Sequence, residues 1–206
     1  MKIILFDFDG VIVDSFAICY KIMRGCEQIT PDGYRARFEG NINDAIKLIP
    51  HDKQPFDFFG QYTPELMKCE PNQAVVRVIK ELVRDHLCII ISSTISDSIK
   101  SYLTAYGLSD LFVEVLGNDV EKSKTKKIEA VLHRYNILPT ETIFITDTLG
   151  DVNEAKKCSV ESIAVTWGFH PAETLQKGNP LCIVDHPADI LTFIKGGKTS
   201  LGRSQG

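Results

Sequence analysis

One stretch near the N-terminus decides the fold: Lys2-Ile3-Ile4-Leu5-Phe6-Asp7-Phe8-Asp9-Gly10-Val11-Ile12-Val13-Asp14-Ser15. Residues 3–6 are apolar and favour β structure, and the run is too short for a helix, which predicts a strand buried on both faces. Two carboxylates, Asp7 and Asp9, follow with one residue between them, and Gly10 lets the backbone bend. Because side chains alternate along an extended chain, both carboxylates would lie on one side, where a cation would offset their repulsion.

The same residues also fit an ordinary turn. Aspartates are common at strand ends, and Asp-Gly is a frequent hairpin signal. Asp14 and Ser15 are common residues at the start of a helix, where their side chains accept hydrogen bonds from free backbone N–H groups. The rest of the chain has to decide between a turn and a two-carboxylate site.

The composition is that of a water-soluble globular protein. The 206 residues are 44% hydrophobic and 24% charged, enough for one sizeable core or for one domain with a smaller insertion. No apolar run approaches the ~20 residues that span a bilayer, and charged Asp7 and Asp9 interrupt the N-terminal apolar segment, so no signal peptide is expected. We therefore expect a cytoplasmic protein.

The net charge and the spacing of the cysteines argue against nucleic-acid-binding, membrane-binding and zinc-binding proteins. A net charge of −4 provides no general attraction to nucleic acid or to an anionic membrane. An anionic substrate would need local positive charge or a metal ion. The six cysteines are scattered without Cys-x-x-Cys spacing, which argues against a structural zinc site and favours reduced thiols.

The chain after Ser15 reads as a small helical unit inserted behind the first strand. We place this unit at residues 16–70. Helical spacing after Ser15 is followed by a break at Asp32-Gly33 and by a second helical segment at residues 42–49. Residues 54–68 are rich in Phe and Tyr, and Pro55, Gly60 and Pro64 are expected to divide them into short pieces without a strand pattern. The core is expected to comprise residues 1–15 and 71–195. The Gly-, Ser- and Lys-rich tail, residues 196–206, is expected to be disordered.

From Pro71 the sequence settles into a strand–helix alternation. Strands are predicted at residues 87–91, 111–116, 142–145 and 162–165, with a short sixth at 181–184. The helices between them are predicted at residues 74–84, 97–106, 126–135 and 152–158. This alternation predicts an α/β fold with a Rossmann-like parallel sheet and helices on both faces, together with the small helical unit.

In such sheets ligands bind at the carboxyl ends of the strands. The polar residues found there are Asp7, Asp9, Ser92, Ser93, Thr94, Asp147 and Asp151, with a lysine-rich segment, residues 122–127, after the third strand. Four carboxylates (Asp7, Asp9, Asp147 and Asp151) would suit Mg²⁺, and a lysine with a hydroxyl would bind the remaining oxygens of a phosphate. One aspartate could attack phosphorus while another exchanges a proton with the leaving group.

Each of these residues also has an ordinary structural role. The lysines could be a solvated helix start, and Ser92, Ser93, Thr94 and Asp151 could cap helices. A single strand end could carry such residues for structural reasons alone, but four strand ends that all do so by coincidence are much rarer. We therefore favour a phosphate site.

The order of these motifs resembles that of the haloacid dehalogenase superfamily, in its phosphoglycolate-phosphatase-like branch, from Lys2 to about Ile194. The resemblance implies that Asp7 is the nucleophile and Asp9 the general acid and base. It implies that Ser92 is the phosphate-binding hydroxyl, with Ser93 beside it as a substrate contact. Mg²⁺ would be held by Asp7, by the main-chain carbonyl of Asp9 and by Asp147, with support from Asp151.

Two departures from the family pattern matter. The third motif often reads Lys-Pro, whereas this chain has Ser123-Lys124-Thr125-Lys126-Lys127. We assign Lys124 to the motif because it lies just ahead of the helical pattern, with Lys122 and Lys126 as rivals. The fourth motif usually begins Gly-Asp and here begins Thr146-Asp147, which keeps the carboxylate.

The inserted helical unit resembles the cap of this family, which closes over the site and contacts the leaving group. Arg37 and Asn41 lie in a segment that resembles the cap loop facing the core, so both are candidate substrate contacts. The resemblance implies a Mg²⁺-dependent phosphatase acting on a small phosphorylated metabolite. A phosphomutase and a non-catalytic phosphate-binding regulatory module are the alternatives, and oligomeric state is not predicted.

Overall fold

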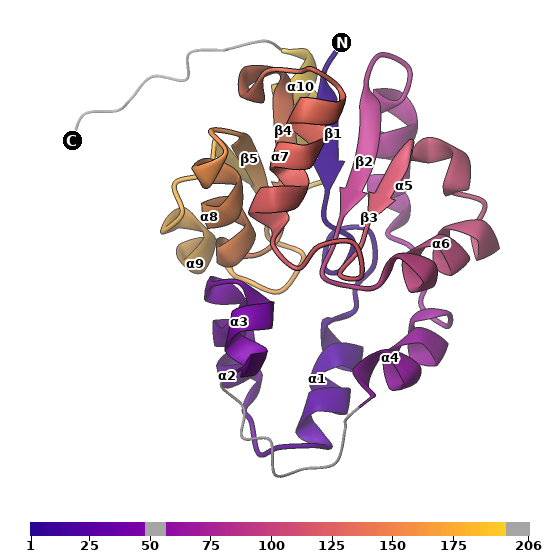
Figure 1. Ribbon diagram of the computed structural model, residues 1–206, viewed down its shortest axis with the longest axis vertical. Helices are drawn as coiled ribbons and strands as arrows, with labels where there is room; N and C mark the ends of the chain where they lie inside the picture. The colour runs from indigo at the N-terminus through magenta and orange to yellow at the C-terminus, as the bar shows by residue number, and fades with distance from the viewer. Residues whose placement is uncertain (48–56, 197–206) are drawn as a thin grey trace.

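The computed structural model describes residues 1–47 and 57–196, and its centre is a parallel β-sheet of six strands (Figure 1). The strand order is β3-β2-β1-β4-β5-β6, so β1 lies between β2 and β4. The strands are β1 (Ile3–Phe6), β2 (Leu87–Ile91), β3 (Glu114–Leu116), β4 (Thr142–Thr146), β5 (Glu161–Val165) and β6 (Cys182–Val184). This arrangement confirms the predicted α/β fold with a parallel sheet.

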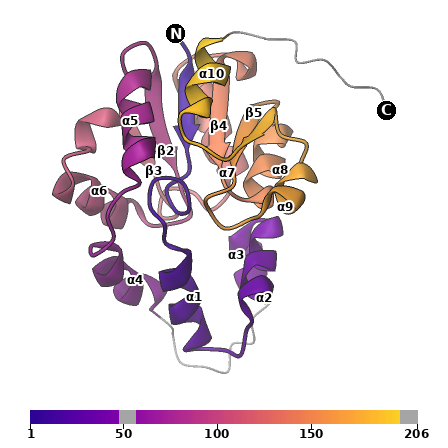
Figure 2. The same cartoon turned by 180° about the vertical axis from the view of Figure 1, so that it is seen from behind.

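Alternation along β1 builds two apolar layers, one on each face of the sheet. Ile3 and Leu5 face one way and pack with Ile128 of helix α7, whereas Ile4 and Phe6 belong to the core on the opposite face. Helices α7 and α8 cover the first face, and α5 and α10 lie across the second (Figures 1 and 2). The α-helices that follow the first strand outside the inserted unit are α5 (Gln73–Leu82), α6 (Ser96–Ala105), α7 (Lys124–Arg134), α8 (Leu149–Lys157), α9 (Ala172–Gln176) and α10 (Asp189–Lys195).

A helical unit lies at the carboxyl ends of the strands (Figures 1 and 2). It comprises α1 (Phe16–Arg24), α2 (Pro31–Ala36), the 3₁₀ turn η1 (Arg37–Glu39), α3 (Ile42–Lys47) and α4 (Phe58–Leu66). We refer to these elements together as the cap. Residues 48–56, including part of the predicted helix at 42–49, lie outside the described residues, as do residues 197–206 of the predicted tail.

Two local predictions in the cap are wrong. The break expected at Asp32 and Gly33 lies inside helix α2, because Pro31 occupies the first turn and the Thr30 side chain caps it by accepting from the Gly33 N–H. Pro64, expected to divide the aromatic-rich segment, lies inside α4. A nine-residue helix therefore carries Tyr62 and Leu66, which are both buried.

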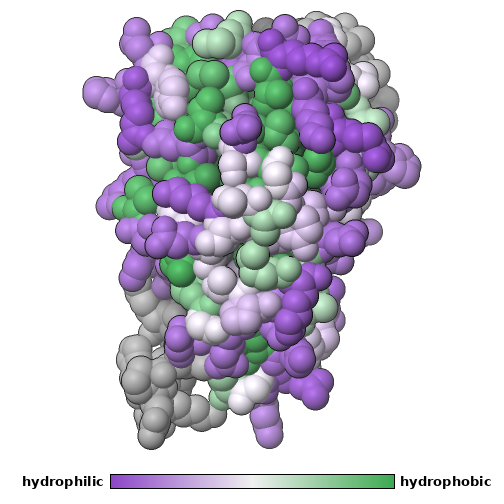
Figure 3. Space-filling model, turned by 90° about the vertical axis from the view of Figure 1, so that its right-hand side faces the viewer, coloured by the Kyte–Doolittle hydropathy of each residue, from purple (hydrophilic) through white to green (hydrophobic). Residues whose placement is uncertain are grey.

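The third strand is shorter than predicted. A 3₁₀ turn, η2 (Ser109–Leu111), occupies the start of the expected strand, and β3 pairs with β2 only over residues 114–116. Seen from the β3 side, hydrophobic surface alternates with hydrophilic surface (Figure 3), and Val113, just before β3, is 55% exposed. Within residues 1–47 and 57–196, no helix has the length and apolar character needed to cross a membrane.

Candidate active site

Asp7 is the first residue after the central strand β1, and its side chain is buried. Its main-chain N–H still donates to the carbonyl oxygen of Ile145 on β4, and its Oδ1 accepts from the N–H of Phe8 at 2.8 Å. Gly10 has a φ of +72°, in the left-handed region that favours glycine. A side chain at Gly10 would collide with the carboxylate of Asp147, so the chain can turn here only with glycine.

Lys124 joins two carboxylates from different strand ends. Its Nζ lies 2.8 Å from Asp7 Oδ2 and 2.6 Å from Asp151 Oδ2. The lysine is buried and begins helix α7, where the Ser123 side chain caps the first turn by accepting from the N–H of Lys126. The rivals Lys122 and Lys126 are both exposed, so the structure brings only Lys124 of the three to Asp7.

The carboxylates around Lys124 have unequal environments. Burial raises the pKa of Asp147 to about 7, and burial also raises the pKa of Asp7 well above its usual range despite the attraction of Lys124. Burial acts on Asp151 in the same direction, but Lys124 and hydrogen bonds outweigh it and hold the pKa of Asp151 below its usual range. One such bond comes from Thr146, whose hydroxyl donates to Asp151 Oδ2 at 2.7 Å. The threonine that replaces the family's glycine thus stabilises the charged form of Asp151.

The residues present fit a divalent cation. Asp147 Oδ2 accepts from the N–H of Phe169, whereas Asp147 Oδ1 is buried without any hydrogen-bond partner among the described residues. Burial raises the pKa values of Asp7 and Asp147 and so disfavours their charged forms, which a hard cation with oxygen ligands would stabilise.

The described part of the chain has no group of three His, Cys, Asp or Glu side chains placed to hold a metal ion. The ligand set that the family resemblance implies needs only two carboxylates, Asp7 and Asp147, with the main-chain carbonyl of Asp9. Mg²⁺ ordinarily completes its shell with water and with phosphate oxygens. The ligand pattern therefore does not depend on a third side chain.

The side chain of Asp9 does not join the Lys124 cluster. Its Oδ1 accepts from the hydroxyl of Ser15 at 2.7 Å and from the hydroxyl of Tyr62, and its Oδ2 accepts from the hydroxyl of Thr94 at 2.8 Å. The expected cluster of four carboxylates therefore does not form: Asp7 and Asp151 meet at Lys124, whereas the side chain of Asp9 faces a separate set of hydroxyls. This separation agrees with different roles for Asp7 and Asp9.

Ser92 follows β2 and is fully buried. Its Oγ accepts from the N–H of Thr94 at 3.0 Å, and its main-chain carbonyl accepts from Nζ of Lys127 at 2.6 Å. Ser93, the other predicted phosphate contact in this loop, is partly exposed. The loop after β2 is thus tied to α7 directly beside Lys124.

The family model described as haloacid dehalogenase-like hydrolase matches residues 4–165. The chain belongs to this family. The matched range contains all but the first residue of β1, the whole cap and the strand ends that carry Asp7, Ser92 and Asp147. The resemblance noted in the sequence is thereby confirmed.

Curated relatives of this hydrolase include phosphoglycolate phosphatases. That of Synechococcus elongatus is 26% identical over 208 residues, covering 94% of this chain and 97% of the relative. That of Vibrio vulnificus (strain CMCP6) is 25% identical over 224 residues, with 94% and 96% coverage. Family and relatives confirm that this haloacid dehalogenase-like protein is an enzyme, a phosphoric monoester hydrolase.

Solved structures share the fold of this hydrolase. A phosphatase from Clostridium acetobutylicum, assigned by prediction, has a TM-score of 0.80 at 19% identity, covering 95% of this chain and 99% of that one. A protein from Thermotoga maritima, assigned by prediction as a β-phosphoglucomutase, has a TM-score of 0.70 at 17% identity, with 96% and 100% coverage. At these identities the similarity shows the fold alone.

The cap residue Arg37 of this hydrolase pairs inside the cap. Both of its terminal nitrogens donate to the carboxylate of Glu27, and both side chains are mostly buried. A bidentate pair of this kind holds the guanidinium in a fixed position. The geometry therefore favours a structural role for Arg37 over the predicted substrate contact.

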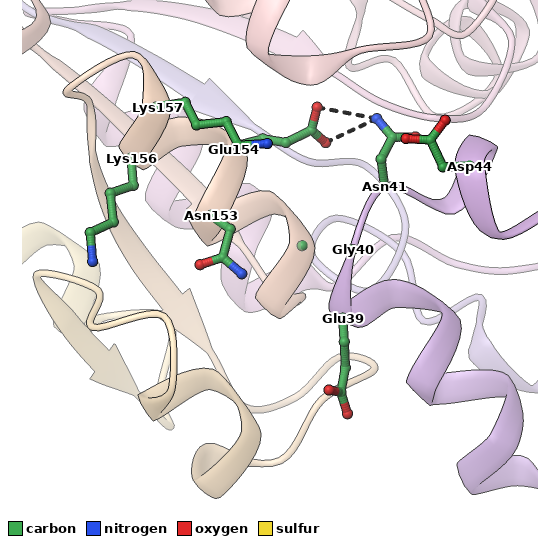
Figure 4. A pocket seen from close by; sticks show the side chains of 9 residues that line it. Glu39, Gly40, Asn41, Asp44, Asn153, Glu154, Lys156 and Lys157 are labelled. Atoms are coloured by element: carbon green, nitrogen blue, oxygen red, sulfur yellow. Dashed lines mark hydrogen bonds between the residues drawn. The ribbon is translucent and has the colours of Figure 1, made fainter.

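Asn41 reaches the core but binds protein groups there. Its Nδ2 donates to both carboxylate oxygens of Glu154 on α8, at 3.1 and 3.2 Å (Figure 4). It also donates to the carbonyl oxygen of Lys122 at 3.3 Å. The contact borders a cavity of about 620 Å³ between the cap and α8, also lined by Glu39 and Lys156 (Figure 4). The structure places Asn41 at a cap–core contact and leaves its predicted substrate contact a prediction.

A second cap–core contact involves Arg35, which the sequence did not single out. Arg35 Nε donates to the carbonyl oxygen of Phe169 at 2.9 Å, and its carbonyl oxygen lies 2.9 Å from Nε2 of buried His170. Because Nδ1 of His170 accepts from the N–H of Leu149, Nε2 carries the ring proton and donates to Arg35. The loop that binds Asp147 through Phe169 thus also holds the cap.

Proposed function

We propose that this hydrolase is a Mg²⁺-dependent phosphatase that cleaves a small phosphorylated metabolite through an aspartyl-phosphate on Asp7. One observation carries the proposal: a buried carboxylate at the end of the central strand lies 2.8 Å from a buried lysine, and Oδ1 of neighbouring Asp147 has no hydrogen-bond partner among the residues that the structure describes. Asp7, Lys124 and Asp147 together combine a nucleophile, a fixed cation and a metal ligand.

Each residue has a distinct role in the proposed reaction. An oxygen of Asp7 attacks phosphorus as the bond to the leaving oxygen breaks, and Asp9 gives that oxygen a proton. Water then attacks the aspartyl-phosphate, with Asp9 accepting a proton from it. Lys124 and Ser92 bind phosphate oxygens, and Lys124 offsets the charge that develops on them.

Asp7, Asp147 and the carbonyl of Asp9 would hold the Mg²⁺, which would supply positive charge to the phosphate and reduce the repulsion between the phosphate and Asp7. Asp151 supports the arrangement indirectly, since its Oδ2 anchors Lys124 and Thr146. The cap, held by Arg35 and Asn41, would exclude water from the attacking carboxylate.

The curated relatives suggest phosphoglycolate as the first substrate to test. We expect Mg²⁺-dependent release of inorganic phosphate from phosphoglycolate or from another member of a phospho-metabolite panel. Asp7→Asn should abolish turnover, whereas Asp14→Asn, at an exposed position of the same segment, should not. Undiminished turnover by Asp7→Asn would contradict the assignment of the nucleophile.

A phosphomutase is the second candidate. It would transfer the phosphoryl group from Asp7 to a sugar hydroxyl instead of water, with the same first step. Product analysis separates the two, because a mutase yields an isomeric sugar phosphate and a phosphatase yields inorganic phosphate. Binding of Mg²⁺ and phosphate without turnover of any panel member would favour a regulatory module.

A further inference from the structure

The carboxylate of Asp9 has three hydroxyl donors, and one of them comes from the cap. Ser15 and Thr94 follow β1 and β2, whereas Tyr62 lies in helix α4. Tyr62 is fully buried, and its ring stacks on that of Phe58 with a centroid distance of 5.6 Å. Tyr62 therefore links the predicted acid and base of the reaction to a cap helix some fifty residues away in the sequence.

From this contact we propose that Tyr62 is a positioning residue, whose hydroxyl orients the Asp9 carboxyl group for proton transfer when α4 is packed against the core. This inference rests on the proposed function, because it assumes that Asp9 exchanges a proton with the leaving group. It adds a residue of the cap to the proton-transfer step.

The distribution of donors over the two oxygens of Asp9 supports the inference. A carboxylate has about four acceptor positions, two on each oxygen. Among residues 1–47 and 57–196, Oδ1 accepts from both Ser15 and Tyr62, whereas Oδ2 accepts from Thr94 alone. With Oδ1 filled, the free position lies on Oδ2, and the transferred proton is directed to that oxygen.

Neighbouring contacts make this orientation depend on the cap. Thr63, the next residue in α4, has its hydroxyl 2.6 Å from the hydroxyl of Ser98 on α6. Two adjacent residues of α4 thus hydrogen-bond to the core, one to Asp9 and one to α6. If α4 moves away, Asp9 loses the Tyr62 donor while Ser15 and Thr94 remain, so Oδ1 regains a free position that competes for the proton.

The chemistry of the first step provides a specific test. As Asp7 bonds to phosphorus, the leaving oxygen needs a proton from Asp9 only when the departing anion is basic. Phenolate is more basic than 4-nitrophenolate, and the two esters differ little in size. The value of kcat/KM reports only the steps up to leaving-group departure, so hydrolysis of the aspartyl-phosphate does not enter it.

We would measure kcat/KM for phenyl phosphate and 4-nitrophenyl phosphate in the wild-type protein, in Tyr62→Phe and in Tyr20→Phe. Tyr20 is a matched control in the cap, because its hydroxyl donates to the carbonyl oxygen of Ile29, away from Asp9. Tyr62→Phe should lower kcat/KM about tenfold for phenyl phosphate and less than about threefold for 4-nitrophenyl phosphate. Tyr20→Phe should leave the ratio of the two values unchanged.

The ratio does not depend on the fraction of folded protein, since both substrates are measured on one preparation. A second variant, Tyr62→Leu, should change the ratio in the same direction. In an Asp9→Ala background, adding Tyr62→Phe should have no further effect on the ratio. Equal losses for both esters, or an unchanged ratio, would overturn the positioning role while leaving the phosphatase proposal intact. Release of phosphate from neither ester and from no member of the phospho-metabolite panel would contradict the phosphatase proposal, and the inference with it.

Discussion

The Nζ atom of Lys127 lies 2.6 Å from the main-chain carbonyl oxygen of Ser92, so a buried lysine on α7 holds the loop that follows β2. Lys127 is 1% exposed and lies one helical turn after Lys124. The two lysines therefore act on different parts of the site. Lys124 reaches the carboxylates, and Lys127 fixes the backbone of the predicted phosphate-binding serine.

Lys127→Met should lower phosphatase activity without removing any group that touches the reacting atoms. Methionine keeps the length of the side chain but leaves the Ser92 carbonyl without its donor, which costs about 1–3 kcal/mol when the group is buried. We expect about a tenfold fall in kcat/KM, because small displacements of phosphate-binding groups are costly. Lys126→Met is the control, because Lys126 is exposed and its Nζ lies 3.7 Å from Oε2 of Glu121, in a weak surface ion pair. Equal activities in the two variants would contradict this role.

Lys127 should also make stability depend on pH in the alkaline range. Burial, with repulsion from Lys124, lowers the pKa of Lys127 from 10.5 to about 8 in the folded protein. Between these values the unfolded chain binds a proton that the folded chain has released, so the free energy of unfolding should rise with pH through this window. The gain should be at most of the order of 3 kcal/mol.

We would measure the free energy of unfolding by urea for the wild-type protein and for Lys127→Met from pH 7.5 to pH 10.5, and follow the difference between the two values. The difference isolates Lys127 from the other groups that titrate in this range. The prediction fails if the free energy of unfolding of the wild-type protein, relative to that of Lys127→Met, stays constant or falls as the pH rises. Either result would show that the pKa of Lys127 is not lowered in the folded protein.

Thr146→Val should weaken the support of Asp151 and thereby the position of Lys124. Valine has the same shape, but it cannot donate to Asp151 Oδ2 or accept from the N–H of Thr148. We expect the free energy of unfolding to fall by about 1–3 kcal/mol and kcat to fall several-fold, because Asp151 also anchors Lys124.

Thr142→Val is the control for Thr146→Val. Thr142 is buried at the other end of β4, and its hydroxyl donates to the carbonyl oxygen of Leu138 at 3.3 Å. Its loss should destabilise the protein without lowering kcat. Chemical denaturation and steady-state kinetics on both variants check the difference, and a kcat that falls equally in both would rule out a site role for Thr146.

The sheet and the strand-end residues were predictable because their signals are local. A buried parallel strand is a short apolar run, and the residue that follows it stands at the carboxyl edge of the sheet. Asp7, Ser92 and Asp147 all lie where this rule places them. Lys124 was harder, because four lysines lie within six residues, two of them are buried by helix α7, and only one of these two reaches Asp7.

The cap contacts could not be predicted because they depend on tertiary packing. The aromatic-rich segment that contains Tyr62 has no pattern that points to Asp9, and the pairing of Arg37 with Glu27 joins η1 to the segment that follows α1. Thr94 was visible in the run from Ser92, but its partner Asp9 lies 85 residues away. Only the fold brings such pairs together.

Gly168→Ala should disable the proposed metal site by displacing Asp147. A Cβ atom on Gly168 would overlap the carboxylate of Asp147, whose Oδ2 must stay in place to accept from the N–H of Phe169. Moving this carboxylate also moves Oδ1, the oxygen without a hydrogen-bond partner in the described part of the chain. We expect kcat to fall about 100-fold and half-maximal activation to need more Mg²⁺, as misplacement by about 1 Å can cost this much.

Gly107→Ala provides the comparison for Gly168→Ala. Gly107 has a φ of +65° at the end of α6, and a Cβ atom there would meet open space. Alanine should therefore cost about 1–2 kcal/mol of stability through backbone strain alone, with unchanged Mg²⁺ dependence. Mg²⁺ titrations of activity on both variants separate loss of stability from loss of metal binding. If Gly168→Ala kept the wild-type Mg²⁺ requirement, Asp147 would not be the metal ligand.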